Sequence, residues 1–165
     1  MISAKGRELL NIDIEGLKAG SVSYGHRFLG PEKFEIQSKD QYIKQLEKQG
    51  CYIDPAKRRE KIVSEAEKLA KTVEGKIVLD DDLLDEVVQI TENPSAILCS
   101  FDHKFLEIPD CVLKTVMIHH QRYIPIECDY VADAVNGVSE HLLLPYFIAI
   151  SNNPRAEARA NIKSG

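Results

Sequence analysis

The sequence lacks the features that mark membrane and secreted proteins. No apolar run approaches the length needed to span a bilayer, and no segment has the layout of a secretory signal. The cysteines lack CxxC spacing, so we expect free thiols, with a disulfide or a zinc site as the less favoured alternatives. They are Cys51, Cys99, Cys111 and Cys128. These absences predict a cytoplasmic protein that contacts no membrane.

An excess of positive charge is also missing. The 165 residues include 21 Lys and Arg against 26 Asp and Glu, which gives a net charge of −5. This balance argues against a freestanding nucleic-acid binder that relies on bulk positive charge. The sequence has no P-loop, GxSxG, HExxH or dinucleotide-binding motif. Motif reading therefore identifies no enzyme and no cofactor.

What the sequence does contain is typical of a globular α+β protein. Hydrophobic residues make up 44% and charged residues 28%, which are ordinary globular values. We predict a single domain over residues 1–165, in which a mixed sheet packs with several helices, and a flexible tail at 152–165. Strands are expected at 9–17, 76–79, 95–101, 123–127 and 143–151, and helices at 39–49, 55–74, 83–88 and 109–120.

The strongest helix signal begins at Asp54-Pro55, where a capping side chain precedes a proline at the first helical position. Gly75 is expected to end this helix. Four apolar residues repeat with helical spacing on one face, and we expect them to pack against a sheet that contains Ile97 and Phe147. They are Ile62, Ala66, Leu69 and Val73.

Two adjacent histidines close a second helix in the segment "TVMIHHQRYIPIE". On a helix that advances about 100° per residue, His120 lies in the middle of the apolar stripe formed by Val112 and Val116. We therefore predict that His120 is buried and that His119 is more exposed. Adjacent residues do not share a helical face, so a shared metal is not expected. Outward contacts or plain solvation both account for His119, Gln121 and Arg122.

Other polar segments carry weaker signals. "GHRF" places His26 and Arg27 beside a glycine, for which a surface turn with a packed Phe28 is the favoured interpretation and an anion-binding loop the alternative. The carboxylates of "LDDDLLDE" lack the glycine and later glutamate of a calcium loop, and a helix N-terminus explains them.

The one basic cluster lies at the start of the long helix. Lys57, Arg58 and Lys61 are candidates for contact with a partner. Arg59 projects onto the apolar side of the helix, so we expect it to form an internal ion pair rather than to bind phosphate.

Five blocks taken together resemble the beta subunit of bacterial heterotetrameric glycyl-tRNA synthetase. The similarity is collinear from about Gly16 to Asn152, and the order and spacing of the blocks carry it. They are "GHRFLGP" (Gly25–Pro31), "LDDDLLDEV" (Leu79–Val87), "SFDHKFLEIP" (Ser100–Pro109), "HHQRYIP" (His119–Pro125) and "LLPYFIAISN" (Leu143–Asn152). Because that subunit is several times longer, the resemblance implies an internal segment of a longer chain.

The resemblance implies a role in charging tRNA with glycine. In this family the alpha subunit uses ATP and glycine to form the adenylate, and the beta subunit of the alpha2-beta2 enzyme mainly binds tRNA. The matching region is similar to part of the tRNA-side module of phenylalanyl-tRNA synthetase beta subunits. It supplies no catalytic residue and no cofactor for this segment. The expected partners are the alpha subunit and glycine tRNA.

The sequence departs from the family pattern in two places. Residues 128–141 replace what is usually a short polar hairpin, and Asn93 stands before Pro94 where an aromatic residue is more usual. The first leaves the connection to the last strand open, and the second leaves the packing of that turn open.

Two other functions compete with a non-catalytic role in tRNA binding. One is an editing-like aminoacyl-tRNA hydrolase that uses His119 or His120 with Asp102 or Glu127. The other is a protein-interaction module within the synthetase, which an exposed apolar patch around Cys111 and Ile118 would favour.

Overall fold

The computed structural model describes residues 12–30, 32–133 and 138–153. The chain divides at Asp54/Pro55 into two compact units. The prediction of one domain over 1–165 stays a prediction. Most of the tail expected at 152–165 lies outside the described residues, but Asn152 belongs to the folded part, because its side-chain oxygen accepts hydrogen bonds from the backbone N–H groups of Glu92 (2.7 Å) and Asn93 (2.9 Å). These bonds hold the turn before Pro94, where Asn93 is buried.

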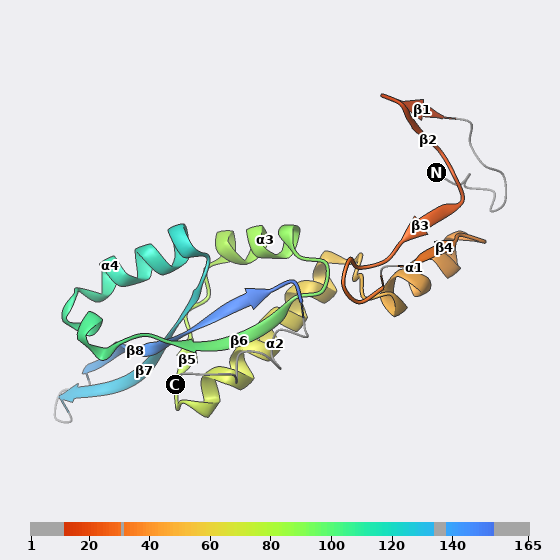
Figure 1. Ribbon diagram of the computed structural model, residues 1–165. Coiled ribbons are helices and arrows are strands. Elements are labelled where there is room, and N and C mark those ends of the chain that lie inside the picture. The colour runs from red at the N-terminus through yellow and green to blue at the C-terminus, as the bar shows by residue number, and fades with distance from the viewer. Residues whose placement is uncertain (1–11, 31, 134–137, 154–165) are drawn as a thin grey trace, which may run out of the picture. The chain divides into compact units, whose positions relative to one another are not determined.

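In its described part, residues 12–30 and 32–54, the first unit contains two short hairpins and one helix (Figure 1). The single strand predicted at 9–17 is wrong, because the backbone turns at Glu15 and Gly16, both with positive φ (51° and 84°). Helix α1 begins after Ser38, whose hydroxyl accepts a hydrogen bond from the Gln41 N–H (3.3 Å) as expected of an N-cap. The elements are β1 (Asp13–Ile14), β2 (Leu17–Lys18), β3 (Val22–Tyr24), β4 (Lys33–Glu35) and α1 (Lys39–Lys48).

The second unit is a four-stranded sheet with helices, and its strand order is β5-β7-β8-β6. Its helices and strands confirm the α+β class. Every strand pair of this sheet is antiparallel, so the expected mixed sheet is wrong. Strands β7 and β8 are joined by a short connection, which permits only antiparallel pairing. The elements are α2 (Pro55–Thr72), β5 (Lys76–Ile77), α3 (Asp81–Ile90), β6 (Ser95–Ser100), the 3₁₀-helix η1 (His103–Glu107), α4 (Asp110–Thr115), the π-helix η2 (Val116–Gln121), β7 (Ile124–Asp133) and β8 (Val138–Ser151).

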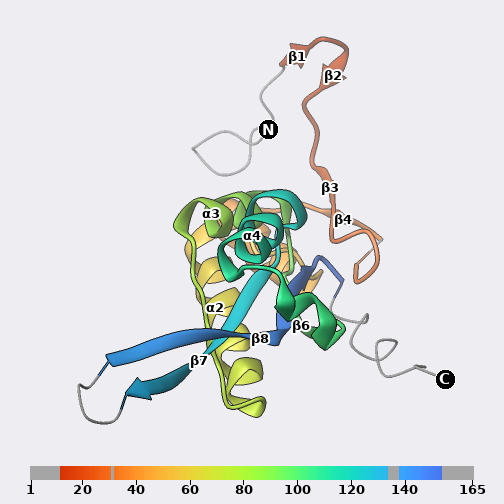
Figure 2. The ribbon, with the colours of Figure 1, turned by 90° about the vertical axis from the view of Figure 1, so that its left-hand side faces the viewer.

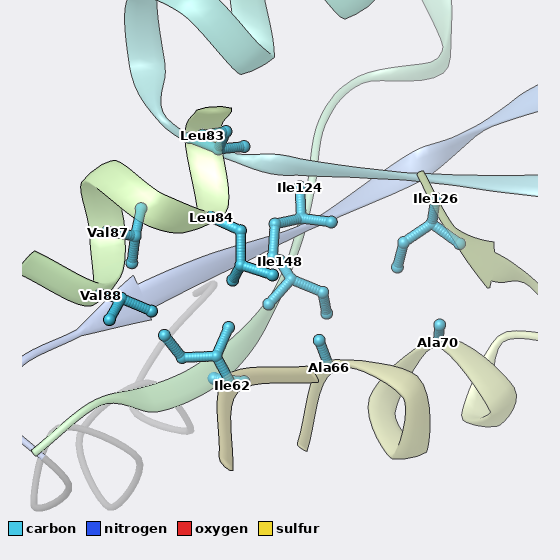
Figure 3. Packing of buried hydrophobic residues seen from close by; sticks show 11 residues of the cluster. Ile62, Ala66, Ala70, Leu83, Leu84, Val87, Val88, Ile124, Ile126 and Ile148 are labelled. Atoms are coloured by element: carbon cyan, nitrogen blue, oxygen red, sulfur yellow. The ribbon is translucent and has the colours of Figure 1, made fainter. Parts of the chain in front are cut away.

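Helices α2 and α3 pack on one face of this sheet (Figure 3). Ile62 and Ala66 of α2 are buried, and Leu69 and Val73 pack half-buried against the same core, as predicted. The sheet also contains Ile97, as expected, although strand alternation turns it away from the helices. Each large aliphatic side chain buried here contributes about 1.5–3 kcal/mol.

The ends of these helices follow from their sequences. Gly75 follows α2 at a close approach, because a Cβ there would lie 2.3 Å from Ile126 Cγ2. Asp80 caps α3 by accepting a hydrogen bond from the Leu83 N–H (2.8 Å). Asp81 and Asp82 occupy the first turn, where negative charge stabilises a helix. The acidic run is therefore explained by helix capping.

Strands β7 and β8 form a long hairpin that extends beyond the helices in two perpendicular views (Figures 1 and 2). It takes in the region that departs from the family pattern, of which 134–137 lie outside the described residues. Within the described parts of the chain, no helix is long and apolar enough to cross a membrane.

Candidate functional site

The two-histidine segment forms a π-helix, not the end of a regular α-helix. Helix α4 gives way at Val116 to η2, and Arg122 caps it with its backbone N–H bonded to the Met117 carbonyl, in the i→i+5 pattern. Arg122 has left-handed backbone angles (φ 56°, ψ 41°). The Tyr123 N–H also bonds to the Met117 carbonyl (2.8 Å), which returns the chain to the sheet.

The prediction that His120 is buried is wrong. Both His119 and His120 are exposed. The π-turn is wider than an α-turn, so a 100° projection loses its phase after Val116. The supposed core stripe also faces solvent, because Val112 is 48% and Val116 42% exposed.

Met117 and Ile118 take the place of that stripe. Met117 is buried, and Ile118 packs half-buried against the core under α2 and α3. The apolar patch proposed around Ile118 is therefore part of the core, although Cys111 is exposed. The side of the segment that carries its histidines is left for solvent or a partner.

The residues after the histidines connect this segment to its neighbours. Arg122 Nε donates to Glu86 Oε1 of α3 (2.6 Å), and both side chains are nearly half exposed. A pair this exposed contributes about 1 kcal/mol or less. The Tyr123 ring stacks on Phe147, with ring centroids 4.4 Å apart. The guanidinium group therefore lies at the surface, whereas the ring belongs to the packing.

The structure does not assemble the pair that a hydrolase would need. Asp102 is paired with Lys104 (3.0 Å) and Glu127 with Lys114. Among the described residues, neither His119 nor His120 forms an ion pair with a carboxylate. The sequence therefore contains the residue types of an acid–base pair, but in the structure both carboxylates pair with lysines and not with His119 or His120.

Among the titratable groups that the structure describes, three have shifted pKa values, each with a local cause. The Lys104 backbone N–H and ammonium group lower the pKa of the Asp102 carboxyl. Hydrogen bonding to Lys76 is the main reason that the pKa of Asp129 is lowered, with His141 adding to it. Burial raises the pKa of the Cys99 thiol, which makes it a poor nucleophile. Neither His119 nor His120 is a cause of any of these shifts.

The "GHRF" loop is organised around a buried histidine. His26 is 1% exposed, and its Nδ1 accepts hydrogen bonds from the N–H groups of Phe28 (3.2 Å) and Leu29 (3.3 Å). The Gly30 N–H bonds to the His26 carbonyl (2.8 Å). These three N–H groups are the donors that an anion would need, so the loop is not an anion nest.

The same loop directs its other side chains outward. Arg27 is exposed, and its guanidinium carbon lies 5.6 Å from the centre of the Phe28 ring. Phe28 is 55% exposed, so the expected packed phenylalanine is wrong. The loop buries its histidine and presents an arginine–phenylalanine pair to solvent.

The basic cluster at the start of α2 is mostly structural. Arg58 is buried, and its Nε donates to the Val88 carbonyl (2.9 Å). Lys61 is half-buried and pairs with Glu65 (3.0 Å). Arg59 binds Asp81 (2.5 Å) and Asp85, so the expected ion pairing is confirmed, but it lies at the surface and not in the interior, because the two Asp side chains are 88% and 72% exposed. Of the contact candidates here, Lys57 alone is exposed.

Metal-binding arrangements are absent from residues 12–30, 32–133 and 138–153, where no group of three or more His, Cys, Asp or Glu side chains is placed to hold an ion. The four cysteines are thiols and not disulfides, as expected. The absence of a metal site in the whole chain stays a prediction.

Sequence reasoning missed a second cation–aromatic pair. Lys33 Nζ lies 5.7 Å from the centre of the Tyr24 ring, and Tyr24 is 57% exposed. The two residues face each other across the β3–β4 ladder. The signal was present, since an aromatic strand residue precedes the "GHRF" glycine, but the strand register is needed to pair it with Lys33.

Comparison with known proteins gives one consistent family. The whole chain, residues 1–165, matches the model of the family described as glycyl-tRNA synthetase beta subunit.

Curated relatives agree with that match. The chain is 39% identical over 94% of its length to the glycine–tRNA ligase beta subunit of Thermodesulfovibrio yellowstonii. It is 41% identical over 82% of its length to the protein of that name from Gloeothece citriformis, and 36% identical over its full length to that of Bacillus subtilis. It spans only 21%, 18% and 22% of these three relatives.

Proposed function

Because this chain belongs to the glycyl-tRNA synthetase beta-subunit family, we propose that it is a non-catalytic segment of that subunit which supports tRNA binding and the charging of tRNA with glycine. The family match over the whole chain is the observation that carries the proposal. The alpha subunit of an alpha2-beta2 enzyme in the cytoplasm would use ATP and form the adenylate. The partners of the segment would be that subunit and glycine tRNA.

The exposed polar residues support a contact role over a catalytic one. His119, Gln121 and Arg122 are exposed on η2 and at its end, while Arg27 and Lys57 are exposed elsewhere. Local cations of this kind bind phosphates and release counterions, so their contribution weakens as salt rises. His26 and Arg58 are buried and Lys61 is paired, so each of these three would act by holding its own neighbours in place. A likeness to the tRNA-side module of phenylalanyl-tRNA synthetase belongs to the same proposal.

Charging by the complete synthetase tests the proposal through Arg122. Arg122→Ala should lower kcat/KM for tRNA severalfold, and glycine-dependent ATP–pyrophosphate exchange should stay at the wild-type rate. Glu86→Ala is the matched control, because it breaks the same ion pair but frees the guanidinium group. If Arg122 contacts tRNA, the Glu86 variant charges tRNA at least as well as the wild type. Equal losses in both variants would assign Arg122 to structure alone.

The hydrolase alternative has its own test. Mischarged tRNA should lose its amino acid at the no-protein rate in the presence of this chain. A robust deacylation rate that His119→Ala or His120→Ala abolishes, without loss of folding, would replace the proposed function with editing.

One observation favours a protein-interaction role as a second candidate. Exposed apolar side chains follow one another from the end of η1 through α4 to the start of η2: Ile108, Val112 and Val116, which are 38%, 48% and 42% exposed. Such a patch is typical of a surface that another protein part covers. Val112→Asp with Val116→Asp should weaken assembly of the synthetase if this candidate is right, and should leave assembly unchanged if it is not.

A further inference from the structure

Four side chains form two cation–aromatic pairs on the same hairpin of the first unit. We use the name display hairpin for β3, β4 and the loop 25–30. The pairs are Arg27 with Phe28, at 5.6 Å, and Lys33 with Tyr24, at 5.7 Å. Both rings are more than half exposed, at 55% and 57%. Large aromatic side chains are normally buried for their apolar surface, so two open rings on one short hairpin need an explanation.

The loop between the strands is built to hold its tip in one conformation. A Cβ on Gly25 would lie 2.6 Å from the Gly30 carbonyl oxygen, so the two ends of the loop touch. The buried His26 side chain ties down two backbone N–H groups inside the loop, and the His26 N–H bonds to the Gln49 carbonyl beyond α1 (2.9 Å). The backbone at Arg27 and Phe28 is therefore set before any ligand arrives, which lowers the entropy cost of binding.

Charge alone does not explain what this hairpin would bind. Arg27 and Lys33 are balanced by Glu32 and Glu35, which are also exposed. A locally neutral hairpin attracts phosphate weakly, and the loop N–H groups are already occupied. What remains is two rings that are more than half exposed, each with a cation over it. An apolar protein surface would suit the rings but would desolvate both cations. An unpaired nucleotide suits both, because its base stacks and its phosphate stays near the cation.

We propose that the display hairpin is a stacking site for unpaired nucleotides of RNA, with Tyr24 and Phe28 as the stacking rings. The proposal rests on the proposed function, since glycine tRNA is the RNA that a synthetase of this family would present. Arg27 and Lys33 hold the rings in place and contact the neighbouring phosphates.

The test uses the complete synthetase and a glycine tRNA transcript, with the dissociation constant measured at several salt concentrations. Tyr24→Leu and Phe28→Leu should each weaken binding about fivefold or more, because a stacked base loses its platform. The salt slope should stay unchanged in both. Arg27→Gln and Lys33→Gln should instead lower the slope by about one or less each. A fully paired RNA duplex should bind the wild type and Phe28→Leu equally.

Phe105→Leu is the matched control, because Phe105 is also an exposed ring with a cation beside it, Lys104 at 5.2 Å, but lies in the second unit. It should leave the affinity for tRNA unchanged. Unchanged binding by Tyr24→Leu and Phe28→Leu, or an equal loss in Phe105→Leu, overturns the proposal. Loss of subunit assembly with normal tRNA binding by the remaining complex also overturns it, in favour of a protein partner.

The outcomes also separate this inference from the proposed function. If Arg122→Ala weakens tRNA binding but the two ring variants do not, the stacking site is wrong and the proposed function stands. If none of the three variants changes tRNA binding or charging, both are wrong. Because both rings are more than half exposed, their replacement should leave Tm unchanged, and a Tm measurement on each variant verifies this.

Discussion

Two of the histidine-bearing segments place their histidines in opposite environments. In the loop 25–30, His26 is buried and its neighbours Arg27 and Phe28 are exposed. In η2, His119 and His120 are exposed while Met117 is buried. The sequence suggested the reverse, with His26 as a contact candidate and His120 in the core. A histidine beside polar residues can thus be the centre of a loop, and one in an apolar stripe can lie at the surface.

The largest expected effect that tests this comparison is the removal of His26. His26→Ala should destabilise the first unit by about 2–4 kcal/mol, because it empties a buried site and leaves the N–H groups of Phe28 and Leu29 without their acceptor. Denaturant unfolding measures this loss. His26→Asn should recover part of it, since a side-chain oxygen can accept in place of Nδ1. A loss below about 0.5 kcal/mol for His26→Ala would show that the loop does not depend on its histidine.

Replacing Gly25, which lies where the two ends of the loop 25–30 touch, should have the next largest effect on stability. Gly25→Ala is expected to cost about 1–3 kcal/mol, since the new Cβ would lie 2.3 Å from Gln49 Cβ and 2.6 Å from the Gly30 carbonyl oxygen. Gly20→Ala is the control, because nothing lies within 4 Å of a Cβ at Gly20. Equal melting temperatures for the two variants would contradict the close approach of Gly25 to Gly30 and Gln49.

A smaller effect on stability tests the left-handed backbone at the end of η2. The order of the glycine and alanine variants should reverse between this position and a position inside a regular helix. Arg122 has φ 56°, a conformation that glycine adopts freely, so Arg122→Gly should be more stable than Arg122→Ala by about 1 kcal/mol. Arg59 lies inside α2, where glycine is less stable than alanine by about 1 kcal/mol. Denaturant midpoints for the four variants should therefore show opposite orders at the two positions. The same order at both would contradict the left-handed cap.

The smallest effect is expected at the exposed histidine. His120→Ala should change the free energy of unfolding by no more than about 0.5 kcal/mol, because the side chain is exposed and packs in no core. Calorimetry on this variant beside His26→Ala measures the contrast directly. A cost above about 2 kcal/mol for His120→Ala would restore the buried position that its spacing predicted.

Local signals predicted where three helices begin, because N-terminal caps act within a few residues. Ser38, Pro55 and Asp80 each mark a helix start in the structure, and the apolar face of α2 is buried as its spacing predicts. The α+β class followed from the same signals. The antiparallel sheet did not, since strand order depends on contacts between residues far apart in the sequence.

The candidate site was harder to predict for two physical reasons. A π-turn uses the same residue types as an α-turn, so nothing in "VMIHHQ" announces the change of phase that exposes His120. The burial of His26 depends on contact with Gln49 at the far end of α1, which is not visible in the loop's own sequence. Resemblance to the family was needed for the function itself, because no catalytic motif is present.

The central claim is that this chain acts at the tRNA step and not in adenylate formation. Steady-state kinetics of the complete synthetase carrying Phe28→Leu tests it most directly, with tRNA charging and glycine-dependent ATP–pyrophosphate exchange measured on the same preparation. We predict a severalfold lower kcat/KM for tRNA at an unchanged exchange rate. A parallel fall in charging and exchange would contradict the claim, as would unchanged charging in this variant and in Tyr24→Leu and Arg122→Ala.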